Sequence, residues 1–206
     1  MKGKTHAGIG AVTFVALYNG VSQNINFVGL VIVIISSLLP DIDHPKGILN
    51  RYILPFKNKA TKVTLYICLG GLVLWVDYLY LRQPIFKAIG FMLIVIALSS
   101  HRNGLTHSLV GMILFGLIMG YIGNYYKITF LVYYFVMGYG MHLICDMATN
   151  RGVSLFYPFS SKKIKWPFTY SSSSKLGSFI EDVIMIVGLI YIVYRFMLIY
   201  NIRFEI

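Results

Sequence analysis

Long apolar runs recur along the whole chain and are separated by short polar segments. Seven of these runs have the composition of buried helices, and they cover residues 7–21, 26–39, 62–81, 85–100, 106–125, 128–149 and 178–201. The joints between the later runs carry helix-breaking signals: Gln83-Pro84, then SHRNG, then GNYYK, then a polar stretch with two prolines and SSSSK. The pattern therefore predicts an all-α protein.

Composition changes this picture from a soluble bundle to a membrane protein. Of the 206 residues, 57% are hydrophobic and only 12% are charged, and the mean hydropathy is +0.72. We expect one integral membrane domain over residues 1–206, a polytopic bundle of about seven helices in the bacterial cytoplasmic membrane. A span needs about 20 residues, so the runs 7–21, 26–39 and 85–100 are short. They could be buried inside the bundle, or the first two could form a shallow hairpin.

The excess of positive charge gives the bundle an orientation. If successive helices alternate in direction, thirteen Lys and Arg residues fall at the end where the first helix starts, and five fall at the other end. The positive-inside rule then makes the first end cytoplasmic and leaves the carboxyl terminus outside. The net charge of +11 is thereby explained by topology, and no nucleic-acid partner is expected. The sequence leaves the oligomeric state open.

The same threading gathers the ionisable side chains that can bind metals. All the histidines fall at the predicted cytoplasmic end: His6, His44, His101, His107 and His142. So do five of the seven acids: Asp41, Asp43, Asp146, Glu181 and Asp182, of which the last two receive no role. Carboxylates at the end of an apolar run are costly unless they are neutralised, and a bound cation would neutralise them.

Three short motifs carry this chemistry. HLICD puts His142 and Asp146 four residues apart on one helical face, where they could share a metal or form a buried hydrogen bond. PDIDHP places two aspartates two residues apart, pointing the same way if the segment is extended, so that either could bridge two cations or simply end the helix. In HRNGLTH, a turn at Asn103-Gly104 could bring two histidines to one site, or the segment could be a polar interfacial loop. Thr106 could cap the helix that follows.

The ligand types indicate which metal to expect. Histidine with carboxylate suits zinc, manganese or iron, and the candidates exceed the three or four ligands that one zinc needs. We therefore expect two or more divalent ions, most simply zinc. Neither Cys68 nor Cys145 has zinc-finger or disulfide spacing, and Cys145 would face away from its neighbour Asp146.

Together the motifs LLPDIDHP, HRNGLTHSL and HLICDMATNRGVSLFYPFS, with an early histidine, resemble those of a known family. This is the YdjM-like family of predicted membrane-bound metal-dependent hydrolases, and the resemblance covers residue 6 to about 160. That family is in turn similar to zinc-dependent phospholipase C and P1-type nucleases, helical enzymes that hold clustered zinc ions with His and Asp. The resemblance implies metal ligands at His6, Asp41, His107, His142 and Asp146, and Asp43, His44 and His101 also match its pattern. The amino-terminal Trp that the soluble relatives use as a ligand has no counterpart in Met1-Lys2, so a third metal of that type is not expected.

The leading functional hypothesis is a membrane-embedded metal-dependent hydrolase. Metal-activated water would attack a phosphoester, most simply a lipid phosphate reached from the inner leaflet, and the candidate catalytic residues are Asp43, Arg102 and Arg151. Two alternatives remain: a metal or proton transporter, and a non-catalytic membrane protein with a structural metal. A basic rim that includes Lys57, Lys59 and SSKKIKWPF could attract anionic lipid or could only determine topology.

Overall fold

The computed structural model describes residues 1–18, 26–99 and 104–200, and within these ranges the chain forms helices and no strands. The helices are α1 (Gly3–Leu17), α2 (Phe27–Leu38), α3 (Ile48–Ile53), α4 (Lys59–Val76), α5 (Pro84–Leu98), α6 (Leu109–Tyr125), α7 (Leu131–Met147) and α8 (Lys175–Ile199). Three single turns are inserted: η1 (Pro40–Asp43), η2 (Asp77–Leu81) and η3 (Leu105–His107). The prediction of an all-α protein is thus confirmed, and each of the seven apolar runs contains one long helix.

The structure differs from the prediction in helix length and number. Only α4 with η2 (Lys59–Leu81, 23 residues) and α8 (25 residues) are long and apolar enough to cross a membrane by themselves, among the residues that the structure describes. The apolar helices α2, α5 and α6 are shorter. The short helix α3, which has no apolar run of its own, was not predicted. The seven-span bundle therefore stays a prediction.

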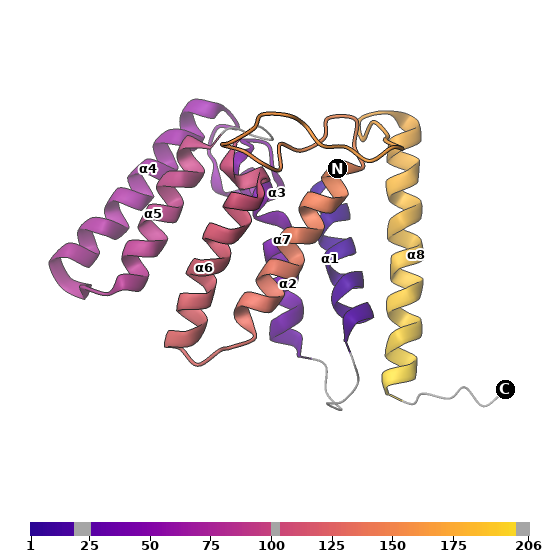
Figure 1. Ribbon diagram of the computed structural model, residues 1–206, viewed down its shortest axis with the longest axis horizontal. Helices are drawn as coiled ribbons and strands as arrows, with labels where there is room; N and C mark the ends of the chain where they lie inside the picture. Colours follow the sequence, from indigo (N-terminus) through magenta and orange to yellow (C-terminus); the bar gives the residue numbers. More distant parts are fainter. Residues whose placement is uncertain (19–25, 100–103, 201–206) are drawn as a thin grey trace.

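The helices lie side by side and alternate in direction (Figure 1). Helices α1, α4, α6 and α8 start at the same end of the bundle, and α2, α5 and α7 finish there. The long segment between α7 and α8 crosses this end, where Trp166 N donates a hydrogen bond to the last carbonyl of α7 and Tyr170 N donates one to the Ala148 carbonyl. The observed directions match the alternating threading, so the histidines of the described chain and most of its acids are gathered at one end.

Side-chain caps fix where several helices begin. Asn26, Asn58, Ser108 and Ser174 each accept a hydrogen bond from a backbone N–H in the first turn of α2, α4, α6 and α8 respectively. The cap of α6 is therefore Ser108, and the expectation that Thr106 would cap this helix is wrong. Leu105, Thr106 and His107 instead form a separate turn, η3, so that the helix starts two residues later.

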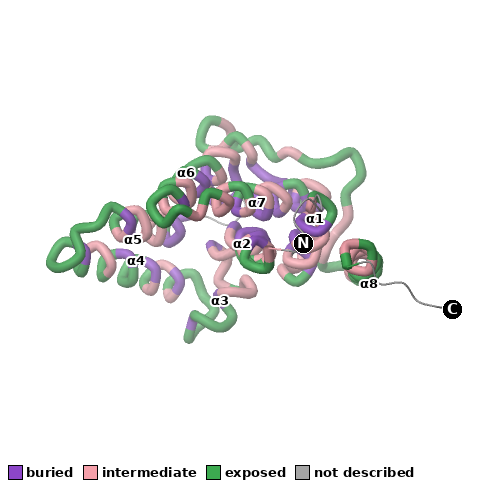
Figure 2. The backbone as a smooth tube through the Cα atoms, turned by 90° about the horizontal axis from the view of Figure 1, so that it is seen from below, coloured by how far each residue is buried: buried purple, intermediate pink, exposed green. Residues whose placement is uncertain are grey.

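The centre of the bundle is the close contact between α2 and α7. A Cβ at Gly138 of α7 would collide with the Ser36 side chain and the Val33 carbonyl of α2. Small residues at this crossing let the two backbones approach closely. Figure 2 shows α1, α2 and α7 together in the middle, with α4 and α5 at one edge and α8, which has few buried residues, at the other.

Helix α8 is held at its start by a buried carboxylate. Glu181 accepts hydrogen bonds from the backbone N–H of Lys2 (3.2 Å) and from Thr5 Oγ1 (2.8 Å), both at the start of α1. It also accepts from the hydroxyls of Tyr170 and Ser172 in the preceding segment. Glu181, for which the sequence suggested no role, therefore ties α8, α1 and the α7–α8 segment together.

Candidate metal centre

Four side chains converge at the end of the bundle where α2 and α7 finish. Asp41 comes from η1, His107 from η3, and His142 and Asp146 from the last two turns of α7. Each offers one donor atom, and these atoms lie within 4.8 Å of one another. The side chains of His107, His142 and Asp146 are fully buried, whereas that of Asp41 is 16% exposed.

The distances between these donor atoms suit a single four-coordinate ion. For the pairs that include an imidazole they run from 3.3 Å between the Nε2 atoms of His107 and His142, through 3.5 Å from His107 Nε2 to Asp41 Oδ1, to 3.9 Å from His142 Nε2 to Asp41 Oδ1. Asp146 Oδ2 lies 3.7 Å from each imidazole. Ligands about 2.0–2.1 Å from a tetrahedral zinc are separated by roughly 3.3–3.4 Å, so a small inward shift would complete the coordination.

The orientation of His142 is set by the backbone of α2. His142 Nδ1 lies 2.7 Å from the carbonyl oxygen of Ser37, which can only accept, so the ring proton is assigned to Nδ1. The lone pair of Nε2 is then directed at the other donors. Such a hydrogen bond from the second ring nitrogen is typical of metal-binding histidines. The close α2–α7 contact at Gly138 is what brings the Ser37 carbonyl within reach.

His107 is oriented from the opposite side by Asp43. Asp43 Oδ2 lies 3.6 Å from His107 Nδ1 and accepts a hydrogen bond from Thr106 Oγ1. Asp43 therefore stands behind the imidazole, on the side away from the four-donor cluster. Burial of the ring opposes protonation, but the carboxylates of Asp41 and Asp43 outweigh it and raise the pKa of His107 to about 9. Without a metal, a proton on His107 thus offsets part of the negative charge of the cluster.

The two aspartates of PDIDHP point in different directions, which corrects the expectation from an extended segment. Pro40–Asp43 forms a 3₁₀ turn, and residues two apart in such a turn are rotated by about 240°. Asp41 consequently faces the cluster while Asp43 supports His107. The segment is fixed by Asn50 of α3, whose Nδ2 donates to the carbonyls of Ile42 (2.7 Å) and His44 (2.9 Å). Tyr66 of α4 in turn donates to Asn50 Oδ1 at 2.7 Å.

His6 lies on the other side of Asp146. Its ring stacks on that of His142 with centroids 3.8 Å apart, and its Nε2 lies 3.3 Å from Asp146 Oδ1. The α-amino group of Met1 donates to the same oxygen at 2.9 Å. Within the described residues the ring nitrogens of His6 make no hydrogen bond although both are buried. Asp146 thus presents Oδ2 to the four-donor cluster and Oδ1 to His6, which is the arrangement of a carboxylate that can bridge two cations.

Two further predicted residues, His44 and Arg151, lie beside the cluster in a cleft. The cleft has a volume of about 580 Å³ and reaches Asp41, the one cluster member with an exposed surface. His44 Nδ1 accepts a hydrogen bond from Lys46 N at 3.2 Å, so its ring proton is assigned to Nε2. The remaining predicted residues, His101 and Arg102, lie outside the described residues.

The lining of the cleft is strongly basic. It contains one carboxylate, Asp41, and five cationic side chains: Lys2, Lys4, Lys46, Arg51 and Arg151. The other polar lining residues include the hydroxyl groups of Ser171–Ser173 and Thr149. An anionic ligand would therefore find both charge and hydrogen-bond donors directly beside Asp41 of the four-donor cluster.

The sequence pattern did not reveal the residues that position the ligands. Asn50, Tyr66 and the Ser37 carbonyl act through folding contacts with residues 6 to 105 positions away. Thr106 was expected only as a cap. The available signal for Thr106 was its position next to the candidate ligand His107. A hydroxyl there is well placed to donate a hydrogen bond to a carboxylate that orients the imidazole.

The fold and the centre define a class: a helical membrane protein with a buried His/Asp cluster, able to hold a metal ion, at one end of its bundle. The sequence matches the family described as YdjM inner membrane protein over residues 1–203, and the chain therefore belongs to that family. An inner-membrane protein is consistent with the two long apolar helices. Neither the curated proteins nor the solved structures include a match to this chain. The likeness to phospholipase C and P1-type nucleases accordingly stays a prediction.

Proposed function

We propose that this protein is a metal-dependent hydrolase that cleaves a phosphoester at the inner membrane. One observation carries the proposal: the four-donor cluster opens, at Asp41, into a cleft whose lining is basic. A buried cluster of metal-binding side chains alone would be compatible with several functions, including a structural site. A cluster with one accessible ligand, beside side chains that attract an anion, is the arrangement that phosphoester hydrolysis needs.

The four-donor cluster has the residues for one divalent ion, which His107, His142, Asp41 and Asp146 would hold. For the second ion expected from the sequence, His6 and Asp146 are the candidate ligands. A bound divalent ion supplies Lewis acidity and a nucleophilic water at neutral pH. Zinc, manganese and iron all accept this mixture of imidazole and carboxylate.

The chain's own residues would bind and orient the substrate. Arg151 and Arg51 can each donate two parallel hydrogen bonds to a phosphate, and Lys46 adds a positive charge. His44, with its proton assigned to Nε2, is the imidazole in the cleft and is our candidate for giving a proton to the leaving group. Asp43 acts through His107: it holds the ring so that Nε2 faces the cluster.

We place this end of the bundle in the cytoplasm. In the threading predicted from the sequence, thirteen of the eighteen Lys and Arg residues fall at the end where the first helix starts, and in the structure α1 starts at the end that holds the cluster. A substrate would then reach the cleft from the inner leaflet or the cytosol.

A structural metal site is the second candidate, and one observation favours it. The cluster already offers four protein donors, which is the full set of a closed structural zinc site, whereas catalytic zinc usually has three. Under this alternative, chelation would unfold the protein and no phosphoester would be cleaved.

The test uses purified protein loaded with zinc or manganese and a panel of phosphate monoesters and diesters, both soluble and lipid-linked. We expect metal-dependent hydrolysis, and we expect Arg151→Gln to raise KM at least tenfold while bound metal stays unchanged. Lys163→Gln is the matched control, since Lys163 is an exposed cation of the same segment outside the cleft lining. No turnover of any substrate by metal-loaded protein would refute the proposal.

A further inference from the structure

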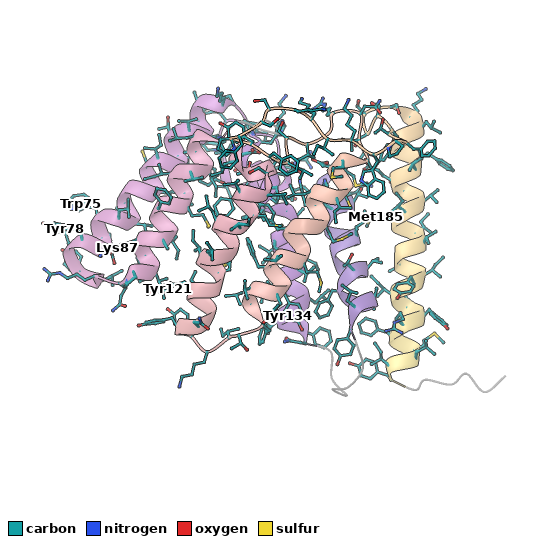
Figure 3. All side chains as sticks on the ribbon, in the orientation of Figure 1. Trp75, Tyr78, Lys87, Tyr121, Tyr134 and Met185 are labelled. Atoms are coloured by element: carbon teal, nitrogen blue, oxygen red, sulfur yellow. The ribbon has the colours of Figure 1, made fainter. Side chains whose placement is uncertain are left out.

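A second cavity lies between α1 and α8, at the edge of the bundle. It is a groove of about 520 Å³ with almost wholly apolar walls, lined by Gly8, Ile9, Val12 and Ala16 of α1 and by residues of α8 between Val183 and Ile192. The two helices touch at glycines: a Cβ at Gly8 would meet the Met185 side chain, and one at Gly188 would meet Val12 Cγ2 at 2.9 Å. Figure 3 shows Met185 in the space between these helices.

The groove and the basic cleft are bounded by the same two parts of the chain. The start of α1 lines the cleft with residues 1–4, and the same helix lines the groove from Gly8 to Ala16. On the other side, Ser171–Ser173 line the cleft just before α8 begins, and α8 lines the groove from Val183. With a rise of 1.5 Å per residue, Lys4 and Gly8 are only about 6 Å apart along α1, and the groove extends for about 12 Å more.

The change from polar to apolar walls falls between the two cavities. Lys4 pairs with Asp182 at 3.1 Å, with both side chains more than half exposed, and this ion pair marks the boundary. On the side of the cleft the walls are basic, and on the side of the groove they are apolar. A ligand that fills both cavities must therefore have an anionic head and a hydrocarbon tail.

We infer that the α1–α8 groove holds an acyl chain of an anionic phospholipid whose phosphate lies in the basic cleft. The choice of a phosphate head rests on the proposed function, and the groove adds that the substrate is membrane-bound and enters sideways between α1 and α8. Helix α8 is a candidate span and packs on α1, so its flank opens toward the lipid hydrocarbon. A chain that leaves the bilayer for this groove stays in apolar surroundings, while its head moves from the interface to cationic side chains beside Asp41.

The test is native mass spectrometry of the metal-free full chain in detergent, with dioleoyl phosphatidic acid, dioleoyl phosphatidylcholine and dihexanoyl phosphatidic acid as probes. We expect one dioleoyl phosphatidic acid to bind at least tenfold more tightly than either of the other lipids. Ala16→Trp and Val187→Trp fill the groove from α1 and from α8, and each should weaken its binding at least tenfold. Both positions are exposed, so a larger side chain does not disturb the packed core. Ile190→Trp is the control, because Ile190 is 64% exposed on α8 and does not line the groove.

Equal binding in the groove variants and the control would overturn the inference. Equal binding of phosphatidic acid and phosphatidylcholine would also overturn it. So would groove variants that lose a dimer and keep their bound lipid, since a second copy of the chain would then be the occupant of the groove. Because the protein is metal-free, the result does not depend on turnover. Selective lipid binding by a protein that hydrolyses no substrate when loaded with metal would refute the proposed hydrolase activity and would still support the lipid-binding site.

Discussion

Asp146→Asn changes the carboxylate that faces the two histidines of the four-donor cluster on one side and His6 on the other. Its Oδ2 faces His107 and His142 at 3.7 Å, and its Oδ1 faces His6 at 3.3 Å. The amide has nearly the same shape as the carboxylate, so the variant removes a negative charge and a strong metal ligand while it keeps the packing of α7. We expect it to lose bound metal.

The expected size of the loss comes from the number of ligands. A four-ligand zinc site binds its ion with roughly 10–16 kcal/mol. One ligand in four therefore accounts for roughly 3 kcal/mol, which is about a hundredfold in affinity. A second ion that shares Asp146 with His6 would be lost as well, because imidazole alone holds zinc weakly.

The assay is zinc per chain by elemental analysis, followed by competition with a chelating dye to obtain the affinity. Asp182→Asn is the matched control: it removes a carboxylate of similar position in the bundle, but one that is 51% exposed and paired with Lys4 instead of facing the cluster. We expect zinc at about a hundredfold higher concentration to restore occupancy in Asp146→Asn, which separates weaker binding from misfolding. Wild-type affinity in Asp146→Asn would show that the cluster is a buried hydrogen-bond network and that no metal is held there.

The residues around the centre and the direction of the bundle give three more expected outcomes. Asp43→Asn should weaken zinc binding by roughly 10–100-fold and leave the stoichiometry at saturation unchanged, because this carboxylate orients a ligand without contacting the ion; an unchanged affinity in a competition titration would contradict that role. Gly138→Ala should destabilise the protein by roughly 1–3 kcal/mol in thermal unfolding, because its methyl group would collide with α2. Gly140→Ala, with only ordinary van der Waals contact, should stabilise α7 by up to about 1 kcal/mol, and equal effects of the two changes would refute the close packing. With both native cysteines replaced by serine, Phe168→Cys should resist an impermeant maleimide on intact cells while Tyr80→Cys is labelled, and the reverse pattern would invert the proposed orientation.

The apolar pattern was sufficient to predict the helices because a membrane or a bundle core imposes it residue by residue. Each of the seven runs became a helix within a few residues of its expected ends. The pattern misleads where a short segment has two locally acceptable conformations. Thr106 could have capped α6, but Ser108 does so, and Pro40–Asp43, which could be extended or turned, forms a 3₁₀ turn.

The gathering of His and Asp at one end of the bundle also follows from the sequence, since alternating helix directions decide which ends coincide. The spacing of His142 and Asp146 is sufficient by itself to place both on one face of α7. The number of membrane spans does not follow in the same way, because a short apolar helix can be buried in protein or can cross the bilayer.

Only the tertiary structure decided which of the collected residues face one another. The fold puts Asp41 and Asp43 on opposite sides of His107, and it places the Ser37 carbonyl where it fixes the proton of His142 on Nδ1. It also brings residues of α3 and of the α7–α8 segment together to line the cleft. These contacts link positions as far as 105 residues apart. A sequence fixes the direction of a side chain only relative to its own helix or turn, and the position of that helix among its neighbours depends on packing at sites such as Gly138, which carry no metal chemistry of their own.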